Sequence, residues 1–289
     1  MKHAYLIVAH KDPDLLNVLV QHLDHEDNDI YIHLDKRVSL KQFTWISNTC
    51  RKSKCFFLEH RCRVSWGSQT QIKAELLLYE YALQKGHYDY FHLMSGCCMP
   101  IKPITFINQF YEDNRGKEFI GFFNRDRESI AYRIKYRFYF RHGYLINHSP
   151  LIASILQTYL IRLQKFFHIT RECGMEPKKG PNWCTLTREA VEYLISSKSF
   201  IKKYFYHGFC ADEIYKQTIL WNSPFRNQIY NQSFVPEGNL YLTIWQGGSH
   251  PYVFKSSDEE LLLNSNMLFA RKFDLEAIIK MKKLFPLID

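Results

Sequence analysis

The sequence predicts an α/β fold with a mostly parallel central sheet flanked by helices, and three features support this prediction. Short apolar runs typical of buried strands alternate with segments of helical periodicity. Hydrophobic residues make up 46% of the chain, which suits a globular domain with a sizeable core. The 289 residues contain no repeat, low-complexity tract or linker rich in Gly, Ser or Pro. We therefore expect a single domain over residues 1–289.

The expected strands are short apolar runs, and most of them end in a turn or a polar segment. The first is followed by Asp12-Pro13-Asp14, which begins a helix with apolar positions on one face. The expected strands cover residues 3–9, 30–34, 55–58, 88–94, 119–123, 183–186 and 241–245.

The other expected helices are recognised by capping residues or by apolar periodicity. Ser68 and Gln71 match a capping box that opens a long helix ending at Gly86. Residues 151–167 repeat apolar positions at a spacing of four, which predicts an amphipathic helix. A second capping box, Ser257 with Glu260, predicts a helix that reaches residue 267.

The ends of two strands predict where a ligand binds, because ligands of open α/β sheets lie beyond the carboxyl ends of the strands. Asp35 follows the second strand, and we expect it to contact a ribose or a base, with a turn residue as the alternative. Ser95-Gly96 follows the fourth strand and allows a ligand to approach the backbone closely. Neither a Walker loop nor a Rossmann glycine motif is present.

The charge and the cysteines limit the class of protein. A formal net charge of +9 predicts an anionic partner: a nucleotide, an acidic glycan, nucleic acid or a membrane surface. The eight Cys show no C-x-x-C spacing, and no apolar run approaches the roughly 20 residues of a membrane span. With no signal peptide recognised, we expect a reduced, cytoplasmic protein.

Asp212 and Glu213 are adjacent carboxylates between apolar residues, directly before a segment of helical spacing. A carboxylate in apolar surroundings has a raised pKa, which is what a general base needs. The alternative is that Asp212 caps the following helix, a role that would also fix the backbone of Glu213.

Residues 125–141 combine six basic residues with interleaved Tyr and Phe. This pattern is typical of a nucleic-acid site, but it also suits a sugar-binding wall, a membrane-facing surface or a solvated helix face. Arg133 and Arg137 are four apart and would share one face if the segment is helical. We expect these two residues to contact an acceptor or an anionic surface.

Seven stretches of the sequence keep one order along almost the whole chain. They are residues 4–14 (AYLIVAHKDPD), 31–36 (YIHLDK), 64–74 (VSWGSQTQIKA), 88–102 (YDYFHLMSGCCMPIK), 180–189 (GPNWCTLTRE), 211–218 (ADEIYKQT) and 268–274 (LFARKFD). Together they resemble the core-2/I-branching β-1,6-N-acetylglucosaminyltransferase family (glycosyltransferase family 14), which also contains peptide O-xylosyltransferases. The chain looks like a bacterial-type member.

The resemblance implies a GT-A-like fold, a nucleotide-sugar donor and inverting transfer without a metal or a cofactor. Residues 1–120 would bind the nucleotide, and residues 121–289 would supply the acceptor and catalytic part. Glu213 matches the family's catalytic base and Lys272 its diphosphate-binding lysine. Asp35 matches its nucleoside contact, and Trp245 lies near its acceptor contacts, where we also place Asp212.

One family feature has no direct match. Mammalian relatives use an Arg as a second cation, but residues 249–255 contain none. His250, Tyr252 or Lys255 could replace it, or Arg271 could reach the diphosphate. Adjacent residues of a helix or strand point to different sides, so the match selects Lys272 over Arg271.

Two D-x-D strings, Asp12-Pro13-Asp14 and Asp27-Asn28-Asp29, are candidates for a metal clamp. Asp, Asn and Pro are common in turns, and we interpret both strings as turn and cap residues on the wrong side of a strand for a metal.

The function expected from the resemblance is transfer of GlcNAc from UDP-GlcNAc in β-1,6 linkage to a glycan or lipid-linked acceptor. UDP-xylose or another UDP-sugar is the alternative donor. The alternative outside the enzyme class is a protein that only binds nucleic acid or anionic lipid. Because the enzyme is the leading hypothesis, we expect no nucleic-acid partner. We expect a cytoplasmic enzyme in possible peripheral contact with an anionic inner membrane face.

Overall fold

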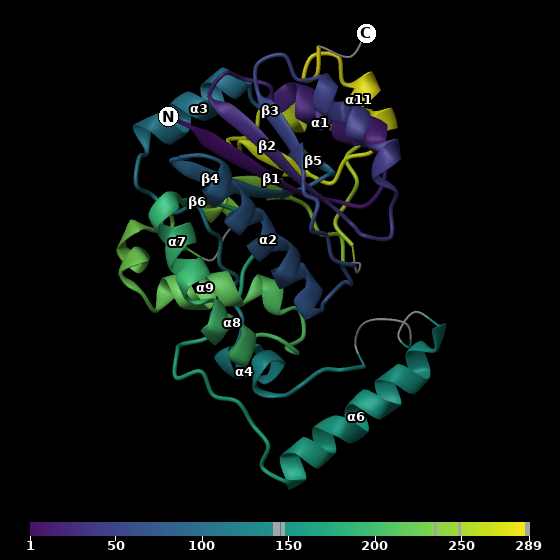
Figure 1. The fold of residues 1–289 in the computed structure, drawn as a ribbon, viewed down its shortest axis with the longest axis vertical. Coiled ribbons are helices and arrows are strands. Elements are labelled where there is room, and N and C mark those ends of the chain that lie inside the picture. Colours follow the sequence, from purple (N-terminus) through teal and green to yellow (C-terminus); the bar gives the residue numbers. More distant parts are fainter. Residues whose placement is uncertain (141–144, 146–147, 234–235, 248–249, 287–289) are drawn as a thin grey trace.

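The computed structural model describes residues 1–140, 145, 148–233, 236–247 and 250–286. Its main sheet has the strand order β3-β2-β1-β4-β6 (Figure 1). The first four of these strands run parallel, and β6 is antiparallel to β4. The prediction of an α/β fold with a mostly parallel central sheet is confirmed. The strands are β1 (His3–Ala9), β2 (Asn28–Leu34), β3 (Lys54–Phe57), β4 (Tyr90–Ser95) and β6 (Cys184–Thr187).

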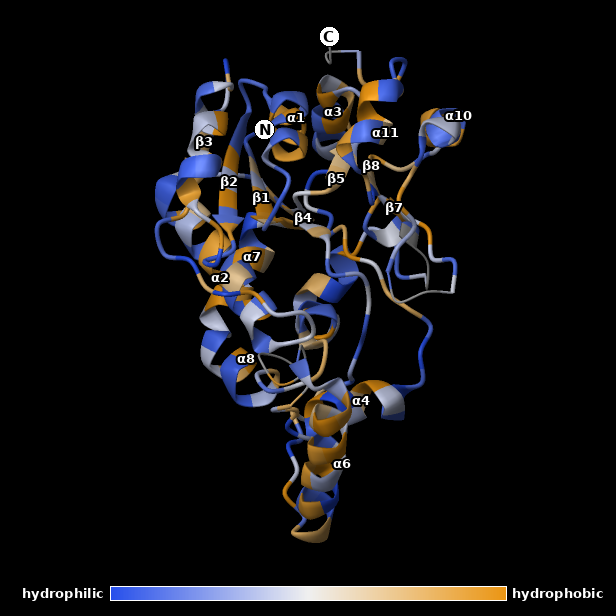
Figure 2. Ribbon diagram, turned by 90° about the vertical axis from the view of Figure 1, so that its right-hand side faces the viewer, coloured by the Kyte–Doolittle hydropathy of each residue, from blue (hydrophilic) through white to orange (hydrophobic). Residues whose placement is uncertain are grey.

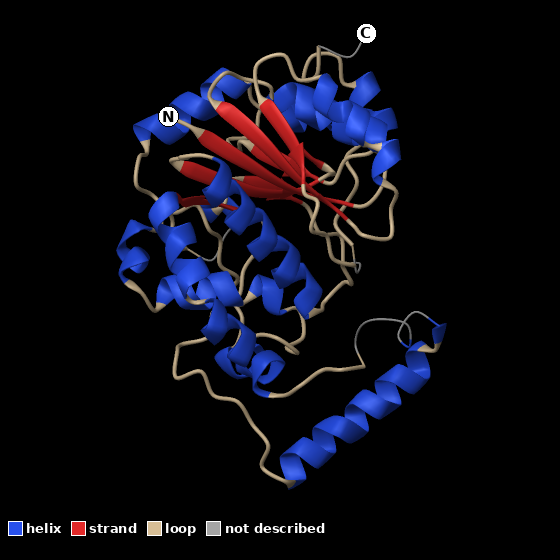
Figure 3. Ribbon diagram, viewed as in Figure 1, coloured by secondary structure: helices blue, strands red, loops and turns tan. Residues whose placement is uncertain are grey.

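Helices cover both faces of this sheet (Figure 3), because alternate residues of each strand point to opposite sides. In β1, Tyr5 and Ile7 belong to one apolar cluster, and Ala4 and Leu6 belong to another. The first cluster also contains residues of α1 (Pro13–Leu23), α3 (Ile104–Asp113) and α11 (Leu275–Lys280). The second contains residues of α2 (Gln69–Lys85), α7 (Arg188–Ser196), α8 (Lys198–Tyr204) and α9 (Tyr215–Trp221).

A second sheet has the order β5-β8-β7 and joins distant parts of the sequence. Its strands are β5 (Cys98–Pro100), β7 (Tyr241–Thr243) and β8 (Phe269–Arg271). β8 lies between the other two, antiparallel to β5 and parallel to β7. The sheet therefore brings the end of β8 next to the turn that follows β4.

The remaining helices lie around these sheets. The α-helices are α4 (Arg127–Lys135), α6 (Pro150–Phe166) and α10 (Glu259–Leu263). Short 3₁₀ helices cover residues 40–42, 44–48, 211–213, 224–228, 236–238 and 256–258. Figures 1 and 2 show α6 extending away from the body of the protein. In the part of the chain that the structure describes, no helix is both long enough and apolar enough to cross a membrane.

Several expected elements differ from the structure. Residues 119–123 do not form a strand, because only isolated bridges from Glu118 to Ile229 and from Phe119 to Thr185 occur there. The expected strand 241–245 ends at Thr243. The expected helix up to residue 267 is split into a 3₁₀ turn and the short α10, which ends at Leu263.

The expected long helices are confirmed, with one difference in the cap. α6 covers Pro150–Phe166, close to the expected 151–167. At the start of α2, the Ser68 hydroxyl accepts a hydrogen bond from the backbone N–H of Thr70. The Gln71 side chain accepts from the N–H of Gly67 and not from that of Ser68, so the reciprocal half of the capping box is displaced by one residue.

Candidate active site

Two neighbouring cavities lie beyond the carboxyl ends of the parallel strands. The first, here called the strand-end cavity, has a volume of about 330 Å³, and its lining includes Ala9 at the end of β1, Asp35 after β2 and Ser95 in β4. The second, here called the carboxylate cavity, has a volume of about 310 Å³, and its lining includes Asp212 and Glu213. This position agrees with the rule that open α/β sheets bind ligands beyond their strand ends.

The two cavities share a wall, so ligands in both cavities can contact the same side chains. Two cationic side chains, two indole rings and one amide line both cavities: Arg271, Lys272, Trp66, Trp183 and Gln71. Positive charge therefore lies between a cavity at the strand ends and a cavity with a carboxylate.

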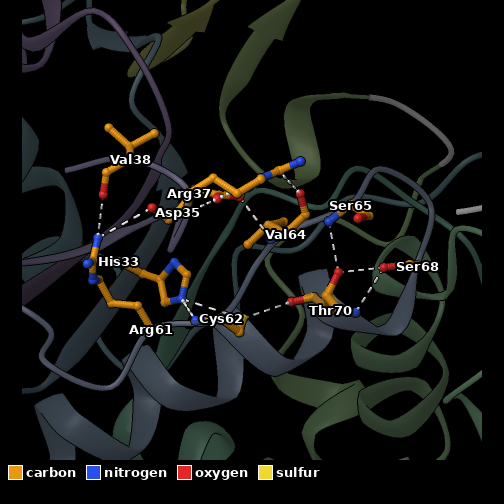
Figure 4. Close-up of polar contacts among 10 residues, drawn as sticks. All are labelled: His33, Asp35, Arg37, Val38, Arg61, Cys62, Val64, Ser65, Ser68 and Thr70. Atoms are coloured by element: carbon orange, nitrogen blue, oxygen red, sulfur yellow. Dashed lines mark hydrogen bonds and ion pairs between the residues drawn. The ribbon is translucent and has the colours of Figure 1, made fainter. Parts of the chain in front are cut away.

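Asp35 lines the strand-end cavity, but protein groups occupy its carboxylate (Figure 4). One oxygen accepts from the backbone N–H of Arg37 at 2.8 Å and from its Nε at 2.9 Å. The other accepts from Arg37 Nη2 at 2.8 Å and from the N–H of Val64 at 2.9 Å. A carboxylate has about four acceptor positions, so a ribose or base would have to replace one of these donors.

The hydrogen bonds to Asp35 also fix its ionisation. Burial opposes the charged form, but donation from Arg37 and Val64 outweighs it and lowers the pKa of Asp35 to about 2. The carboxylate thus joins the end of β2 to the loop that carries Trp66, a residue of the shared wall. The direct nucleoside contact stays a prediction.

Ser95 and Gly96 line the strand-end cavity, as their position after the fourth strand predicts. The Ser95 hydroxyl lies 3.2 Å from Cys97 Sγ and 3.1 Å from Cys98 Sγ. A Cβ atom on Gly96 would lie 3.0 Å from the Cβ of Ala9, a tight contact that would require a small shift. Glycine therefore allows close packing between the ends of β1 and β4.

Glu213 lines the carboxylate cavity and forms an ion pair that the sequence did not predict. Lys179 Nζ lies 2.6 Å from Glu213 Oε2, and the side chain of Glu213 is 30% exposed. Lys179 also lies over the ring of Phe123, another residue of this cavity. Glu213 is therefore only partly exposed, and it contacts both solvent and a cation.

Asp212 is the buried member of the carboxylate pair. Its Oδ1 has no hydrogen-bond partner among the described residues, although Asp212 lines the carboxylate cavity. Burial, followed by the charges of Glu213 and Glu75, raises the pKa of Asp212 well above its ordinary value. Asp212 does not cap a helix, because Ile214 occupies the N-cap position of α9; that alternative was wrong.

A buried ion pair supports the backbone of this stretch. Lys216 Nζ donates to Glu75 at 2.5 Å and to Asn182 at 2.6 Å, and the Tyr215 hydroxyl donates to Glu75 at 2.7 Å. Lys216 also donates to the carbonyl oxygen of Asp212 at 3.3 Å. Removal of one partner would leave an uncompensated buried charge, which typically costs about 3–5 kcal/mol.

Arg271 and Lys272 line both cavities, so the expectation that only one of them can reach the site is wrong. The alternation of a strand separates neighbouring side chains, but β8 ends at Arg271 and the alternation ends with it. The guanidinium of Arg271 lies 5.2 Å from the centre of the Trp183 ring. The backbone of Lys272 bonds to Tyr252 and Phe254, which fixes its position.

The three residues expected to replace the second cation differ in whether they reach the cavities. His250 lines the carboxylate cavity together with Trp245, whose side chain is 53% exposed. Tyr252 and Lys255 line neither cavity. The Tyr252 hydroxyl donates to Asp258, and the backbone N–H of Lys255 donates to the same carboxylate. His250 and Arg271 thus remain at the cavities, and a second phosphate contact by either residue stays a prediction.

Arg133 and Arg137 do not share a helical face. α4 ends at Lys135, so Arg137 lies in the following extended segment. The Arg133 guanidinium stacks on the ring of Phe209, and Arg137 donates to the hydroxyl of Tyr139. Neither arginine lines the two cavities, and their contact with an acceptor stays a prediction.

The two D-x-D strings occupy different ends of the sheet. Asp12 is at the N-cap position of α1 and lines the strand-end cavity, so its interpretation as lying on the wrong side of a strand is wrong. Asp27 precedes β2 at the opposite end. Among the described residues it belongs to a group with His25 and Glu26 whose ligating atoms lie within 4.8 Å of one another.

These features define a class of protein: an α/β enzyme in which a cavity with two cations adjoins a cavity with a carboxylate, as group transfer from an anionic donor requires. Residues 3–264 match the family described as Core-2/I-Branching enzyme. The chain therefore belongs to the Core-2/I-Branching enzyme family and is a glycosyltransferase. This family membership contradicts the alternative that the protein only binds nucleic acid or lipid.

Three solved structures are similar to parts of the chain at low identity. Staphylococcus aureus TarS (residues 1–349) shares 12% identity over 50% of this chain and 44% of that chain, with a TM-score of 0.29. Mouse xyloside xylosyltransferase 1 shares 12% identity over 76% of this chain and 82% of that chain, with a TM-score of 0.35. The glycosyltransferase GlyE of Streptococcus pneumoniae shares 14% identity over 71% of this chain and 44% of that chain, with a TM-score of 0.26. The matches thus span less than half of TarS and GlyE. No curated protein matches the chain.

Proposed function

We propose that this glycosyltransferase uses a UDP-sugar, transfers the sugar with inversion, and requires no metal. The shared wall of the two cavities supports this proposal most. The UDP moiety would occupy the strand-end cavity, and the acceptor would occupy the carboxylate cavity. The diphosphate would then lie at the wall between them, beside Arg271 and Lys272.

In this reaction Glu213 acts as the general base. It takes the proton from the acceptor hydroxyl while the hydroxyl oxygen bonds to the anomeric carbon of the sugar. The bond from that carbon to the β-phosphate oxygen breaks, and its electron pair leaves with UDP. Arg271 and Lys272 stabilise the charge that develops on the departing diphosphate. Attack from the side opposite to the leaving group inverts the anomeric carbon.

UDP-GlcNAc is the leading candidate donor and a β-1,6 branch the leading candidate product. UDP-xylose or another UDP-sugar would fit the same scheme, since no described contact selects the sugar. A screen of UDP-sugars, scored by release of UDP and by protection of the protein against heat, decides among them. Failure of every UDP-sugar to protect the protein would contradict the proposal.

The role of Glu213 has its own test. Glu213→Gln should lower kcat by about 10²-fold or more and leave UDP affinity nearly unchanged. Glu172→Gln is a matched control, because Glu172 is an exposed carboxylate that pairs with a lysine, Lys135, away from both cavities. Near-normal turnover of Glu213→Gln would remove Glu213 as the base.

Metal independence is tested by chelation. The two cations at the shared wall support a reaction that survives EDTA, whereas Asp12 at the strand-end cavity is the carboxylate that would hold a metal there. We expect full activity in EDTA. Loss of activity in EDTA that Mn²⁺ or Mg²⁺ restores in the wild type but not in Asp12→Asn would show a metal-dependent enzyme.

The proposed acceptor is a glycan or a lipid-linked saccharide. Three aromatic side chains of the carboxylate cavity, Trp66, Trp183 and Trp245, offer apolar faces on which sugar rings can pack. We further propose that the enzyme works in the cytoplasm, in peripheral contact with an anionic membrane face. The net charge of +9 supports such contact.

A further inference from the structure

α6 is held to the rest of the protein by one face only. The four buried residues of the helix are Ala153, Gln157, Ile161 and Gln164. Gln164 accepts a hydrogen bond from the backbone N–H of Arg137 at 2.9 Å, and Gln157 accepts from that of Phe140 at 3.0 Å. Both amides also donate to the carbonyl oxygen of Arg137. These bonds fix which side of the helix faces outward.

The outward side of α6 is covered by large apolar residues. With 3.6 residues per turn, spacings of three and four keep side chains on one face. The exposed fractions of Leu151 and Phe166 are 73% and 76%. Apolar residues that are exposed singly are common, but a contiguous apolar face marks an interaction surface. The surface consists of Leu151, Ile152, Ile155, Leu156, Tyr159, Leu163 and Phe166, and Phe167 and Ile169 continue it.

The charge around this surface identifies the class of partner. Between Ser129 and Arg171 the sequence contains six Lys or Arg and no Asp or Glu. Arg162 and Lys165 lie on α6 itself, and both are exposed. A second copy of the chain would bring the same positive charge to the interface, so self-association is disfavoured. An apolar helix face flanked by cations fits the surface of an anionic bilayer.

We propose that α6 is a membrane-docking helix, which lies in the interface of an anionic bilayer with its apolar face in the lipid. This deepens the membrane contact proposed above and rests on that contact, not on the transfer chemistry. It also specifies the side of the molecule that meets the membrane, since α6 extends from one end of the body (Figure 1).

The docking helix is also connected to the active site. Ile161 of α6 packs with Tyr136 and Phe138, and Phe209 packs against this small cluster. The ring of Phe209 lies 5.8 Å from that of Trp66, which lines both cavities. One chain of aromatic contacts therefore leads from α6 to the shared wall.

The test uses the full-length protein and sedimented vesicles. We expect binding to phosphatidylcholine vesicles that contain phosphatidylglycerol, and much weaker binding to phosphatidylcholine alone. Leu151→Ser/Ile155→Ser/Phe166→Ser should lower the partition coefficient by at least about tenfold. Phe106→Ser/Leu261→Ser/Ile279→Ser is the matched control, because these residues are also exposed but lie on α3, α10 and α11. This control should bind like the wild type.

A second variant keeps every apolar contact of α6 and so also tests the proposal if the triple variant folds poorly. Arg162→Gln/Lys165→Gln should weaken binding to the anionic vesicles by roughly 30-fold at low salt, about fivefold for each charge. Lys41→Gln/Lys202→Gln removes two exposed lysines elsewhere and should have little effect.

Three results would overturn the proposal. The first is equal binding of the wild type to neutral and anionic vesicles, and the second is wild-type binding by both α6 variants. The third is a dimer in the absence of lipid that Leu151→Ser/Ile155→Ser/Phe166→Ser converts to a monomer, since α6 would then bind a second copy. Glu213→Gln should bind vesicles like the wild type. Loss of transfer in that variant therefore reports on the reaction and not on docking.

Discussion

Lys179 Nζ lies 2.6 Å from Glu213 Oε2, so the carboxylate proposed as the base is held by a cation in the free protein. The ion pair fixes the position of this carboxylate at the edge of the carboxylate cavity. The nitrogen of Lys179 could also contact an acceptor hydroxyl as it reaches Glu213.

The first prediction concerns this ion pair. Lys179→Met should lower kcat by several-fold, because Glu213 loses the ion pair that positions its carboxylate at the carboxylate cavity. Lys178→Met is the matched control, since Lys178 pairs with Glu176 at 2.8 Å and not with Glu213. An unchanged kcat in Lys179→Met would mean that this ion pair does not position the base.

The second prediction concerns the cations of the shared wall. A lost charge-assisted hydrogen bond to a diphosphate costs about 1.5–3 kcal/mol, so Lys272→Ala and Arg271→Ala should each weaken UDP binding by roughly 10–150-fold. Lys255→Ala should change the affinity little, because Lys255 lines neither cavity. Titration calorimetry with UDP measures all three. If Lys255 matters more than the other two, the diphosphate lies outside the shared wall.

The third prediction follows from Asp35. Its pKa is lowered from 3.8 to about 2, so its contribution to stability is present above pH 3.8 and is lost as the pH falls through 2. The difference corresponds to roughly 2 kcal/mol. Asp35→Asn should therefore lower the free energy of unfolding by about that amount at pH 7, with a smaller deficit near pH 2. Urea titrations at both pH values measure it, and a deficit independent of pH would speak against this origin.

The fourth prediction concerns Asp212, whose pKa is shifted in the opposite direction to that of Asp35. Because its pKa is raised above 3.8 in the folded protein, the contribution of Asp212 to stability is most favourable below pH 3.8 and is lost as the pH rises through the raised value. Asp212→Asn removes this loss, so the stability of the variant relative to the wild type should increase with pH. Thermal unfolding between pH 4 and pH 8 would show the trend. A variant that loses stability relative to the wild type as the pH rises would disprove it.

The sequence predicted the main sheet because each strand is a local apolar run, and apolar runs of that length are buried. It failed at residues 119–123, where the run is apolar but only Glu118 and Phe119 find bridge partners. Whether such a run becomes a strand depends on its neighbours in space, which are distant in the sequence.

The family resemblance singled out Glu213 and Lys272, and both residues line the candidate site. The ion pair of Lys179 was not predicted, because its partner Glu213 is 34 positions away and the residues around Lys179 have the pattern of an ordinary loop. The state of Asp212 and Glu213 was also not predictable, because apolar neighbours in sequence bury the first and leave the second partly exposed.

The position of β8 sets an order for the assembly of the active site during protein synthesis. β8 contributes residues 269–271 and pairs with β5 on one side and β7 on the other. The backbone N–H of Ile101 bonds to Leu268, and that of Phe273 bonds to Cys97, so this late segment holds the turn after β4. A growing chain on the ribosome can pair β1, β2 and β4 early, but the shared wall forms only after Lys272 has left the exit tunnel. Nascent chains that stop before this point would carry an incomplete strand-end cavity.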